Sequence, residues 1–318
     1  MAHVIFVHGL SNKPPALDLH RMWKRALAKD GGIDLATDGI NSTMVYWADV
    51  FYSEPDTDSA ALQESSEPLM TVAQTAAIAQ SQLLISNDMP SVEEAFVRRL
   101  AERVDVEVTK TVIVAPTNET PVGGTVVYEM IPLPDFLKER IMASFVQEAY
   151  AFLFDKESNP RPGVTYHVRE ELRRRFVAAV KTARESSPNE PIVVVSHSMG
   201  TMIAYDCLKR VPDCPAIDVL MTIGSPLGID EVQEGLQPEW TRSDGFPSQK
   251  LLGKWINIFD PFDAVARLDP RLANDYCQAG AAVIEDIEEE NWGAWRHNIT
   301  HYLQGKKLRS AMTAALKI

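Results

Sequence analysis

The sequence predicts an α/β protein with a mostly parallel central sheet and helices on both faces. Three observations lead to this fold class. Strand-like apolar runs alternate with helical runs in both halves of the 318-residue chain. The runs VIFVHG and PIVVVSHS are apolar without interruption, which is typical of strands buried on both faces. The segments between most of these runs are long enough to hold the crossover helix that parallel strands need.

The first half begins with one strand, helix, strand unit. Residues 4–9 (VIFVHG) form the expected first strand, and its closing Gly marks a turn. Residues 17–32 have the helical spacing of apolar side chains and end in Gly31 and Gly32, which stop a helix. Residues 43–50 (TMVYWADV) are expected to form the second strand.

The second half repeats the alternation. We expect a helix at about 166–185, a strand in PIVVVSHS, a helix in MGTMIAYDCLKR, and two more strands at 218–225 and 254–260. Together with the two strands of the first half, these make five strands for a single sheet. The acidic run EDIEEEN (285–291) is expected to be a solvated turn.

Residues 51–165 interrupt this order, because an ordinary crossover needs only about a dozen residues or slightly more. They include a helix with apolar positions Phe96, Val97, Leu100 and Val104, a small hairpin, and a second amphipathic helix ending near Phe152. We therefore expect an α/β core made of residues 1–50 and 166–318. Residues 51–165 would be an inserted cap or lid of mixed structure.

Composition and charge exclude several classes of function. The net charge of −13 disfavours a nucleic-acid binder, which needs clustered Lys and Arg. No apolar run approaches the roughly 18 residues of a membrane span, so no stable membrane insertion is expected. The first residues do not have the pattern of a signal peptide. The three cysteines are too few for a disulfide framework or a zinc site, and the cytoplasm is the expected compartment.

The segment IVVVSHSMGTMIAYDCL has the pattern of a nucleophile elbow, a tight turn between a strand and a helix with a central Ser. Ser198 is that serine, and Ser196 and Gly200 are the small residues two positions away on either side. Small residues are needed because the backbone turns sharply and the strand and helix approach closely. The backbone N–H of Met199, at the start of the next helix, would point at an oxyanion.

These residues resemble the α/β-hydrolases, a superfamily of esterases, lipases and thioesterases. The resemblance covers both halves of the chain but not the insertion, and Ser196 stands where the family usually has Gly. In the family an HG turn after the first strand supplies the second oxyanion donor. His8 and Gly9 match that turn, so the resemblance assigns this role to the backbone N–H of Leu10.

The resemblance also implies an acid after the last strand, where Asp260 and Asp263 are candidates. The run D-A-V-A-R-L-D-P is similar to the acid segment of the class 3 lipases, which favours Asp263. Asp260 stays the alternative; otherwise it is expected to cap a turn, a common role of Asp in loops.

Two histidines follow the acid and are candidates for the base. Asn298 is a plausible N-cap, which leaves His297 in the preceding loop and His301 in the first turn of a helix. The family base lies on a loop, and the spacing from His297 to Tyr302 resembles the H-x4-Y arrangement of the lipases. His297 is favoured, and His301 stays the alternative. The order Ser198, Asp263, His297 is the order of this fold.

The expected function is that of a serine hydrolase that cleaves a carboxylic ester through an acyl-enzyme, without a metal or organic cofactor. A thioesterase or lipase would use the same residues. A catalytically silent binding protein on this fold is the alternative from another class. The expected partner is a small-molecule ester, and the strongly acidic chain favours a neutral or cationic soluble ester over an anionic lipid surface. The sequence leaves the oligomeric state open.

Overall fold

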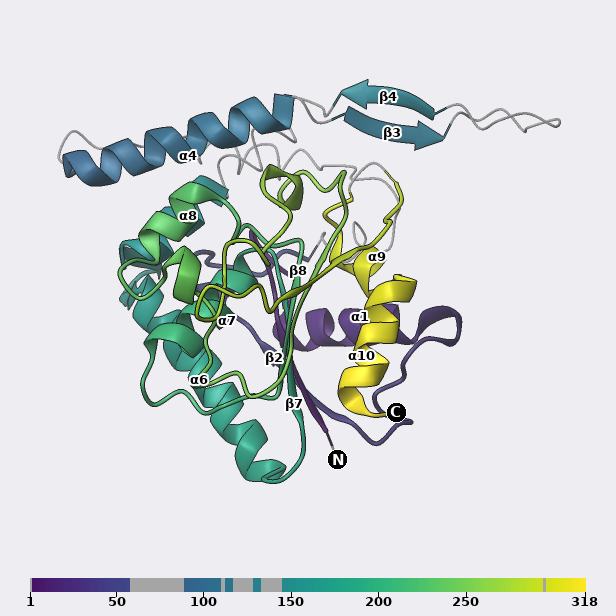
Figure 1. The fold of residues 1–318 in the computed structure, drawn as a ribbon. Coiled ribbons are helices and arrows are strands. Elements are labelled where there is room, and N and C mark those ends of the chain that lie inside the picture. Colours follow the sequence, from purple (N-terminus) through teal and green to yellow (C-terminus); the bar gives the residue numbers. More distant parts are fainter. Residues whose placement is uncertain (1, 58–88, 110–111, 117–127, 133–144, 294–295) are drawn as a thin grey trace.

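A parallel six-stranded sheet forms the centre of the described part of the protein in the computed structural model (Figure 1). The structure describes residues 2–57, 89–109, 112–116, 128–132, 145–293 and 296–318. The strands are β1 (His3–Val7), β2 (Asn41–Val45), β7 (Ile192–His197), β8 (Val219–Ile223), β9 (Trp255–Phe259) and β10 (Glu285–Glu288). Their order is β10-β9-β8-β7-β1-β2, and every adjacent pair is parallel.

The sheet confirms the five strands expected from the sequence and corrects two details. β2 ends at Val45, and residues 48–50 form a 3-10 turn instead of continuing the strand. The acidic run at 285–291 was expected to be a turn, but its first four residues form β10. An edge strand tolerates these charges because it pairs on one side only, and Asp286 has backbone and side-chain partners there.

Helices cover both faces of the sheet. α1 (Ala16–Ala28), α9 (Ile299–Gln304) and α10 (Lys306–Leu316) pack on one face. α6 (Val168–Ser186), α7 (Met199–Arg210) and α8 (Asp230–Gly235) lie on the other (Figure 1). Alternate residues of each strand enter the two cores: Phe6 joins the first and Ile5 the second. This alternation explains why the central strands are apolar without interruption.

Two helices of 51–165 share the second core. The stripe of α4 (Ser91–Thr109) is buried there, as are Phe145, Ala149 and Phe152 of the helix at 145–153. The expected hairpin is present as β3 (Val112–Pro116) paired with β4 (Tyr128–Pro132), and β5 (Glu157–Arg161) pairs with β6 (Val164–His167). Residues 58–88, 117–127 and 133–144 lie outside the described residues, so the role of a lid stays a prediction.

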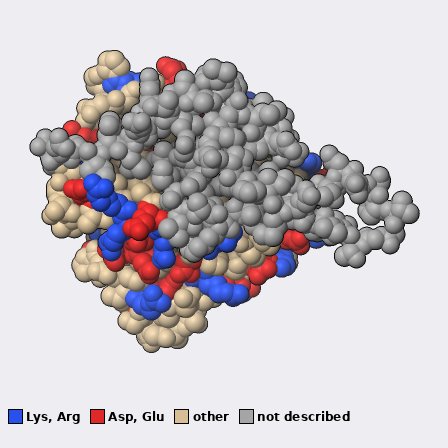
Figure 2. Space-filling model, turned by 90° about the horizontal axis from the view of Figure 1, so that it is seen from above, with Lys and Arg blue, Asp and Glu red and all other residues tan. Residues whose placement is uncertain are grey.

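Ion pairs also join the insertion to the rest of the chain. Arg99 and Arg103 of α4 pair with Glu234 and Asp230 of α8. Figure 2 shows basic and acidic side chains side by side on the described part of the face seen from above. Pairs as exposed as these contribute less than about 1 kcal/mol each, so apolar packing holds α4 in place.

No helix among the described residues is long and apolar enough to cross a membrane. The three cysteines, all within the described ranges, are buried thiols that form no disulfide.

Candidate active site

The predicted site residues follow β1, β7, β9 and β10 at the carboxyl edge of the sheet, with β8 between β7 and β9. Strand register brings their loops together, because Val7 of β1 lies opposite Ser196 of β7, and Ile223 of β8 lies opposite His197 and Ile258. β1 pairs with β2 on one side and β7 on the other. The strand order therefore reverses at β1, which makes this position a topological switch point. Ligands of open α/β sheets bind at such a point, beyond the carboxyl ends of the strands.

Ser198 occupies a strained turn between β7 and α7. Its φ of 54° and ψ of −129° lie in a region that non-glycine residues rarely adopt. The turn is buried, and two glycines make room for it. A Cβ on Gly9 would lie 2.6 Å from the Cβ of Ser198, and a Cβ on Gly200 would lie 2.5 Å from the carbonyl oxygen of His8. This sharp strand-to-helix turn around Ser198 has the backbone shape that the sequence pattern predicts, and the role of nucleophile stays a prediction.

Ser196, which departs from the usual glycine, fits this turn without an unsatisfied group. It is the penultimate residue of β7, and its hydroxyl donates to the carbonyl oxygen of Met221 on β8 at 3.1 Å. The Oγ of Ser198, in contrast, is buried and makes no hydrogen bond with any described residue. A buried hydroxyl without a partner costs stability, so such a group is a candidate for a function in chemistry.

Asp263 and His297 form a buried pair. The Nδ1 of His297 lies 2.8 Å from both carboxylate oxygens of Asp263. Gly224, the residue after β8, lies directly behind the pair, since a Cβ there would come within 2.9 Å of Asp263 Oδ2 and 3.1 Å of His297 Nδ1. The pair therefore needs glycine at this position, which also has a φ of +55°.

Four donors hold the Asp263 carboxylate. Besides His297, they are the Tyr302 hydroxyl at 2.7 Å and the backbone N–H groups of Val265 and Ala266 at 2.8 and 3.1 Å. Burial opposes the charge, but the charge of His297 and the bonds from His297 and Tyr302 hold the pKa of Asp263 below its usual value. Asp263 is therefore a carboxylate at neutral pH and can fix the orientation of the imidazole.

His197 links this pair to the serine. Its ring packs against the His297 ring with centroids 4.6 Å apart, and its Nε2 lies 3.0 Å from the carbonyl oxygen of His297. On the other side, the N–H of Ser198 donates to the carbonyl oxygen of Ile223, directly before Gly224. The serine turn is therefore joined to His297 through His197, and its backbone is bonded to the residue before Gly224. Burial and the charge of His297 lower the pKa of His197 well below 6.5, so its ring is neutral.

The residues of both predicted oxyanion donors lie near Ser198 in the chain or in space. Met199 is the first residue of α7, and Leu10 follows Gly9, which lies against the serine. Neither N–H donates a hydrogen bond to another described residue. Met199 also lies at the positive end of a helix.

His8 organises the loop of residues 8–13, called the β1 loop below. Its Nδ1 donates to the carbonyl oxygen of Gly9 at 2.9 Å, and its Nε2 accepts the backbone N–H of Trp47 at 2.9 Å. The Trp47 indole stacks on the His8 ring and donates to its carbonyl oxygen. Burial and the nearby Lys13 ammonium lower the pKa of His8 well below 6.5. A neutral ring supplies the one donor and one acceptor used here.

The alternative acid and base lie in other contacts. Asp260 accepts the backbone N–H groups of Phe262 and Asn291 and pairs with Arg296 at 3.0 Å. Burial raises the pKa of Asp260 despite these partners. His301 stacks on Trp292 with centroids 4.4 Å apart. Asp260 therefore caps a turn: its carboxylate binds Phe262, Asn291 and Arg296, and its contact with Asp263 is through its carbonyl oxygen, which accepts the Asp263 N–H at 3.0 Å.

The sequence did not assign a role to several residues that shape the site. Tyr302 entered only as part of a spacing, whereas its hydroxyl bridges Asp263 and the N–H of Asp260. Gly224 and Trp47 were not singled out. The GSP turn after β8 was the available signal for Gly224, but the contact of Trp47 with His8 depends on strand pairing and has no local pattern.

A cavity of about 660 Å³ lies elsewhere, at the opposite end of the strands. It is lined by the starts of β8 and β9, by β10 and by α10, with Lys254, Lys306 and Lys317 among its charged residues. None of the predicted site residues lines it.

The described residues contain no group of three or more His, Cys, Asp or Glu side chains arranged to hold a metal ion. No protein-family model matches the chain, and no curated protein matches its sequence.

Proposed function

We propose that this chain is a serine hydrolase of the α/β-hydrolase type, which cleaves a carboxylic ester through an acyl-enzyme. One observation carries the proposal. A buried serine with strained backbone angles lies at a strand-to-helix turn, and the residue before it, His197, packs against a histidine bound to a buried carboxylate. The proposal needs both the fold and the site, because the fold alone is shared by proteins with many other functions.

The first half of the reaction acylates the serine. Ser198 Oγ attacks the ester carbonyl carbon while His297 accepts the hydroxyl proton, and the carbonyl oxygen becomes an oxyanion. The Leu10 and Met199 N–H groups stabilise that charge. When the intermediate collapses, the ester C–O bond breaks, and the imidazolium gives its proton to the leaving alcohol.

The second half repeats the same steps with water as nucleophile. His297 accepts a proton from water, the hydroxide adds to the acyl carbon, and collapse returns the proton to Ser198 as the acid leaves. Asp263 stays ionised throughout, holds the imidazole in one tautomer and stabilises the imidazolium. Its four donors and lowered pKa support this role.

Ser198 Oγ makes no hydrogen bond with any described residue, and this is compatible with the proposed chemistry. Catalytic hydrogen bonds are often long before substrate binds and tighten in the complex. Thioesters pass through the same oxyanion, so the leaving group depends on the pocket, and the net charge of −13 favours neutral or cationic soluble esters.

A fluorophosphonate probe tests the proposal, because it phosphonylates an activated serine. We expect labelling of Ser198, located by peptide mapping, and hydrolysis of short p-nitrophenyl esters. Ser198→Ala should abolish both, with a loss of at least about 10⁴-fold in kcat. Ser196→Ala is the matched control, because Ser196 lies two residues away and its hydroxyl has a structural partner; this variant should keep both activities.

The proposal is wrong if the folded wild-type protein is not labelled at Ser198, or if Ser198→Ala hydrolyses the esters at the wild-type rate. Wild-type protein that binds esters without turnover would instead favour the silent binding protein.

A further inference from the structure

Glu148 is a buried carboxylate that joins the insertion to the β1 loop. It lies on the helix at 145–153, is 1% exposed, and is 137 residues from Ser11 in sequence. The backbone N–H of Ser11 lies 3.1 and 3.3 Å from its two carboxylate oxygens. The Tyr52 hydroxyl donates to Oε1 at 2.7 Å.

These bonds hold an unfavourable backbone conformation. Ser11 has a φ of +68°, in the left-handed region that costs a residue other than glycine about 1 kcal/mol or more. Such a conformation persists only where its surroundings hold it. Hydrogen bonds from backbone N–H groups to a charged acceptor are roughly twice as strong as neutral ones, which makes a buried carboxylate suited to this task.

The Leu10–Ser11 peptide group is held at both ends. Its N–H donates to Glu148, and its carbonyl oxygen accepts a hydrogen bond from the Lys13 ammonium. The preceding peptide group, Gly9–Leu10, is held at its carbonyl oxygen by His8. Because a peptide group is planar and trans, its C=O and N–H point in opposite directions. Fixing these two planes fixes the direction of the Leu10 N–H.

We propose that Glu148 is a positioning residue that aims the Leu10 N–H at the oxyanion by holding Ser11. The inference depends on the proposed function, because it assigns a task to a donor of that reaction. It also gives the helix at 145–153 a task in the reaction, because this helix supplies a group that completes the oxyanion hole.

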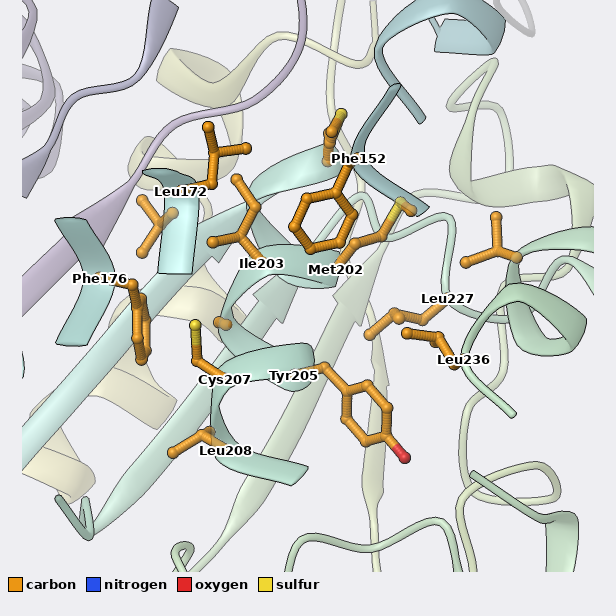
Figure 3. Close-up of a cluster of buried hydrophobic side chains, with 14 of the residues drawn as sticks. Phe152, Leu172, Phe176, Met202, Ile203, Tyr205, Cys207, Leu208, Leu227 and Leu236 are labelled. Carbon is orange, nitrogen blue, oxygen red and sulfur yellow. The ribbon is translucent and has the colours of Figure 1, made fainter. Parts of the chain in front are cut away.

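The helix that carries Glu148 is packed against the element that carries the nucleophile. Phe152 lies beside Met202 and Ile203 of α7, the helix that starts directly after Ser198 (Figure 3). Phe145 and Ala149 are buried in the same core. Glu148 and Ser198 therefore belong to one packed unit, which keeps the donor and the nucleophile in register.

The test compares turnover with the binding of a transition-state analogue. A trifluoromethyl ketone adds to the serine and places an oxyanion in the hole, so its inhibition constant reports on the donors. Glu148→Ala should lower kcat by about tenfold to a hundredfold, less than or equal to the loss on deleting a donor outright, and should change KM little. The affinity for the ketone should fall by the same factor as kcat/KM.

Two further variants make the test independent of folding problems. Glu148→Gln should recover part of the loss, because its amide oxygen still accepts the Ser11 N–H. Tyr52→Phe keeps the buried carboxylate and removes one of its partners, so kcat and ketone affinity should each fall by only about threefold to tenfold, the value of one hydrogen bond.

Glu93→Gln is the matched control. Like Glu148, Glu93 is a carboxylate of the insertion that accepts from a tyrosine hydroxyl, here that of Tyr150; it is only partly buried, and it pairs with Lys156. It has no hydrogen bond to the β1 loop, so its loss should lower thermal stability without changing kcat or ketone affinity.

The outcomes separate the two proposals. If wild-type protein is not labelled at Ser198, the proposed function fails. If wild-type protein is active and the Glu148 and Tyr52 variants keep its kcat and ketone affinity, the positioning role is wrong. A loss of kcat without a matching loss of ketone affinity overturns it too, because a merely structural residue would act in that way.

Discussion

Replacing Gly9 with alanine tests whether the close approach of the β1 loop to Ser198 is needed for catalysis. The added Cβ would lie 2.6 Å from Ser198 Cβ and 2.9 Å from His197 Nδ1. The first contact is about 0.8 Å shorter than the 3.4 Å at which ordinary contacts begin, so either the serine or the loop must shift by most of an ångström. Gly9 does not have a positive φ, so alanine causes no backbone strain of its own.

A shift of this size should reduce kcat/KM for a short p-nitrophenyl ester by about a hundredfold, because misplacing reacting groups by 1 Å costs that much. The rate of fluorophosphonate labelling should fall with it. Gly163→Ala is the control: Gly163 has a φ of +74° with nothing within 4 Å of the added Cβ, so it should lose stability but keep activity. Gly9→Ala with kcat/KM within about threefold of wild type, in a protein that needs Ser198, would refute the reasoning.

Three other changes test the proposed role of Asp263, the hydrogen bonds of Tyr302 and the neutral state of His301. Asp263→Asn should lower kcat by about 10⁴-fold, because an amide no longer holds the productive tautomer of the histidine; if Asp260→Asn gives that loss instead, the two aspartates have been assigned in the wrong order. Tyr302→Phe removes the bridge to Asp263 and leaves the buried N–H of Asp260 unsatisfied, so urea melts should show a loss of about 2 kcal/mol in the free energy of unfolding and ester assays about a tenfold lower kcat. An unchanged urea midpoint would contradict it. Burial lowers the pKa of His301 from 6.5 to about 4, so the unfolded chain binds a proton between these values that the folded protein does not. The free energy of unfolding should therefore fall as pH drops below 6.5, by about 1.4 kcal/mol per pH unit for this residue. His301→Phe, which keeps an aromatic ring on Trp292, should flatten that slope in urea melts at pH 4.5 to 6.5, and an unchanged slope would count against a neutral His301.

The elbow and the strands around it could be predicted because their signals are local. An apolar run followed by a small-residue turn around Ser198 requires only neighbouring residues, and the observed β7 and α7 agree with it closely. The N-cap role of Asn298 is equally local, and its side chain accepts the N–H of Thr300 as expected. The β10 strand was missed because its acidic letters resemble a turn, and edge pairing with β9 outweighed that local preference.

Local sequence patterns could not decide between the two candidate aspartates, Asp260 and Asp263. Asp260 and Asp263 lie three residues apart and both are fully buried, so composition does not separate them. What separates them is which donors the surrounding loops bring: Arg296 and two backbone N–H groups for Asp260, His297 and Tyr302 for Asp263. The sequence could favour Asp263 only through its resemblance to a lipase segment.

The sequence by itself determined the alternation of strands and helices and the position of the sharp turn at Ser198. These follow from periodicity and from glycine and serine at a few adjacent positions, which act over one or two turns of chain. Only the tertiary structure decided that Glu148 binds the Ser11 N–H, that Trp47 binds His8, and that Gly224 lies behind Asp263 and His297. Each of these contacts joins segments distant in sequence, and it forms only when parallel pairing aligns the carboxyl ends of the strands and the two cores close over the sheet.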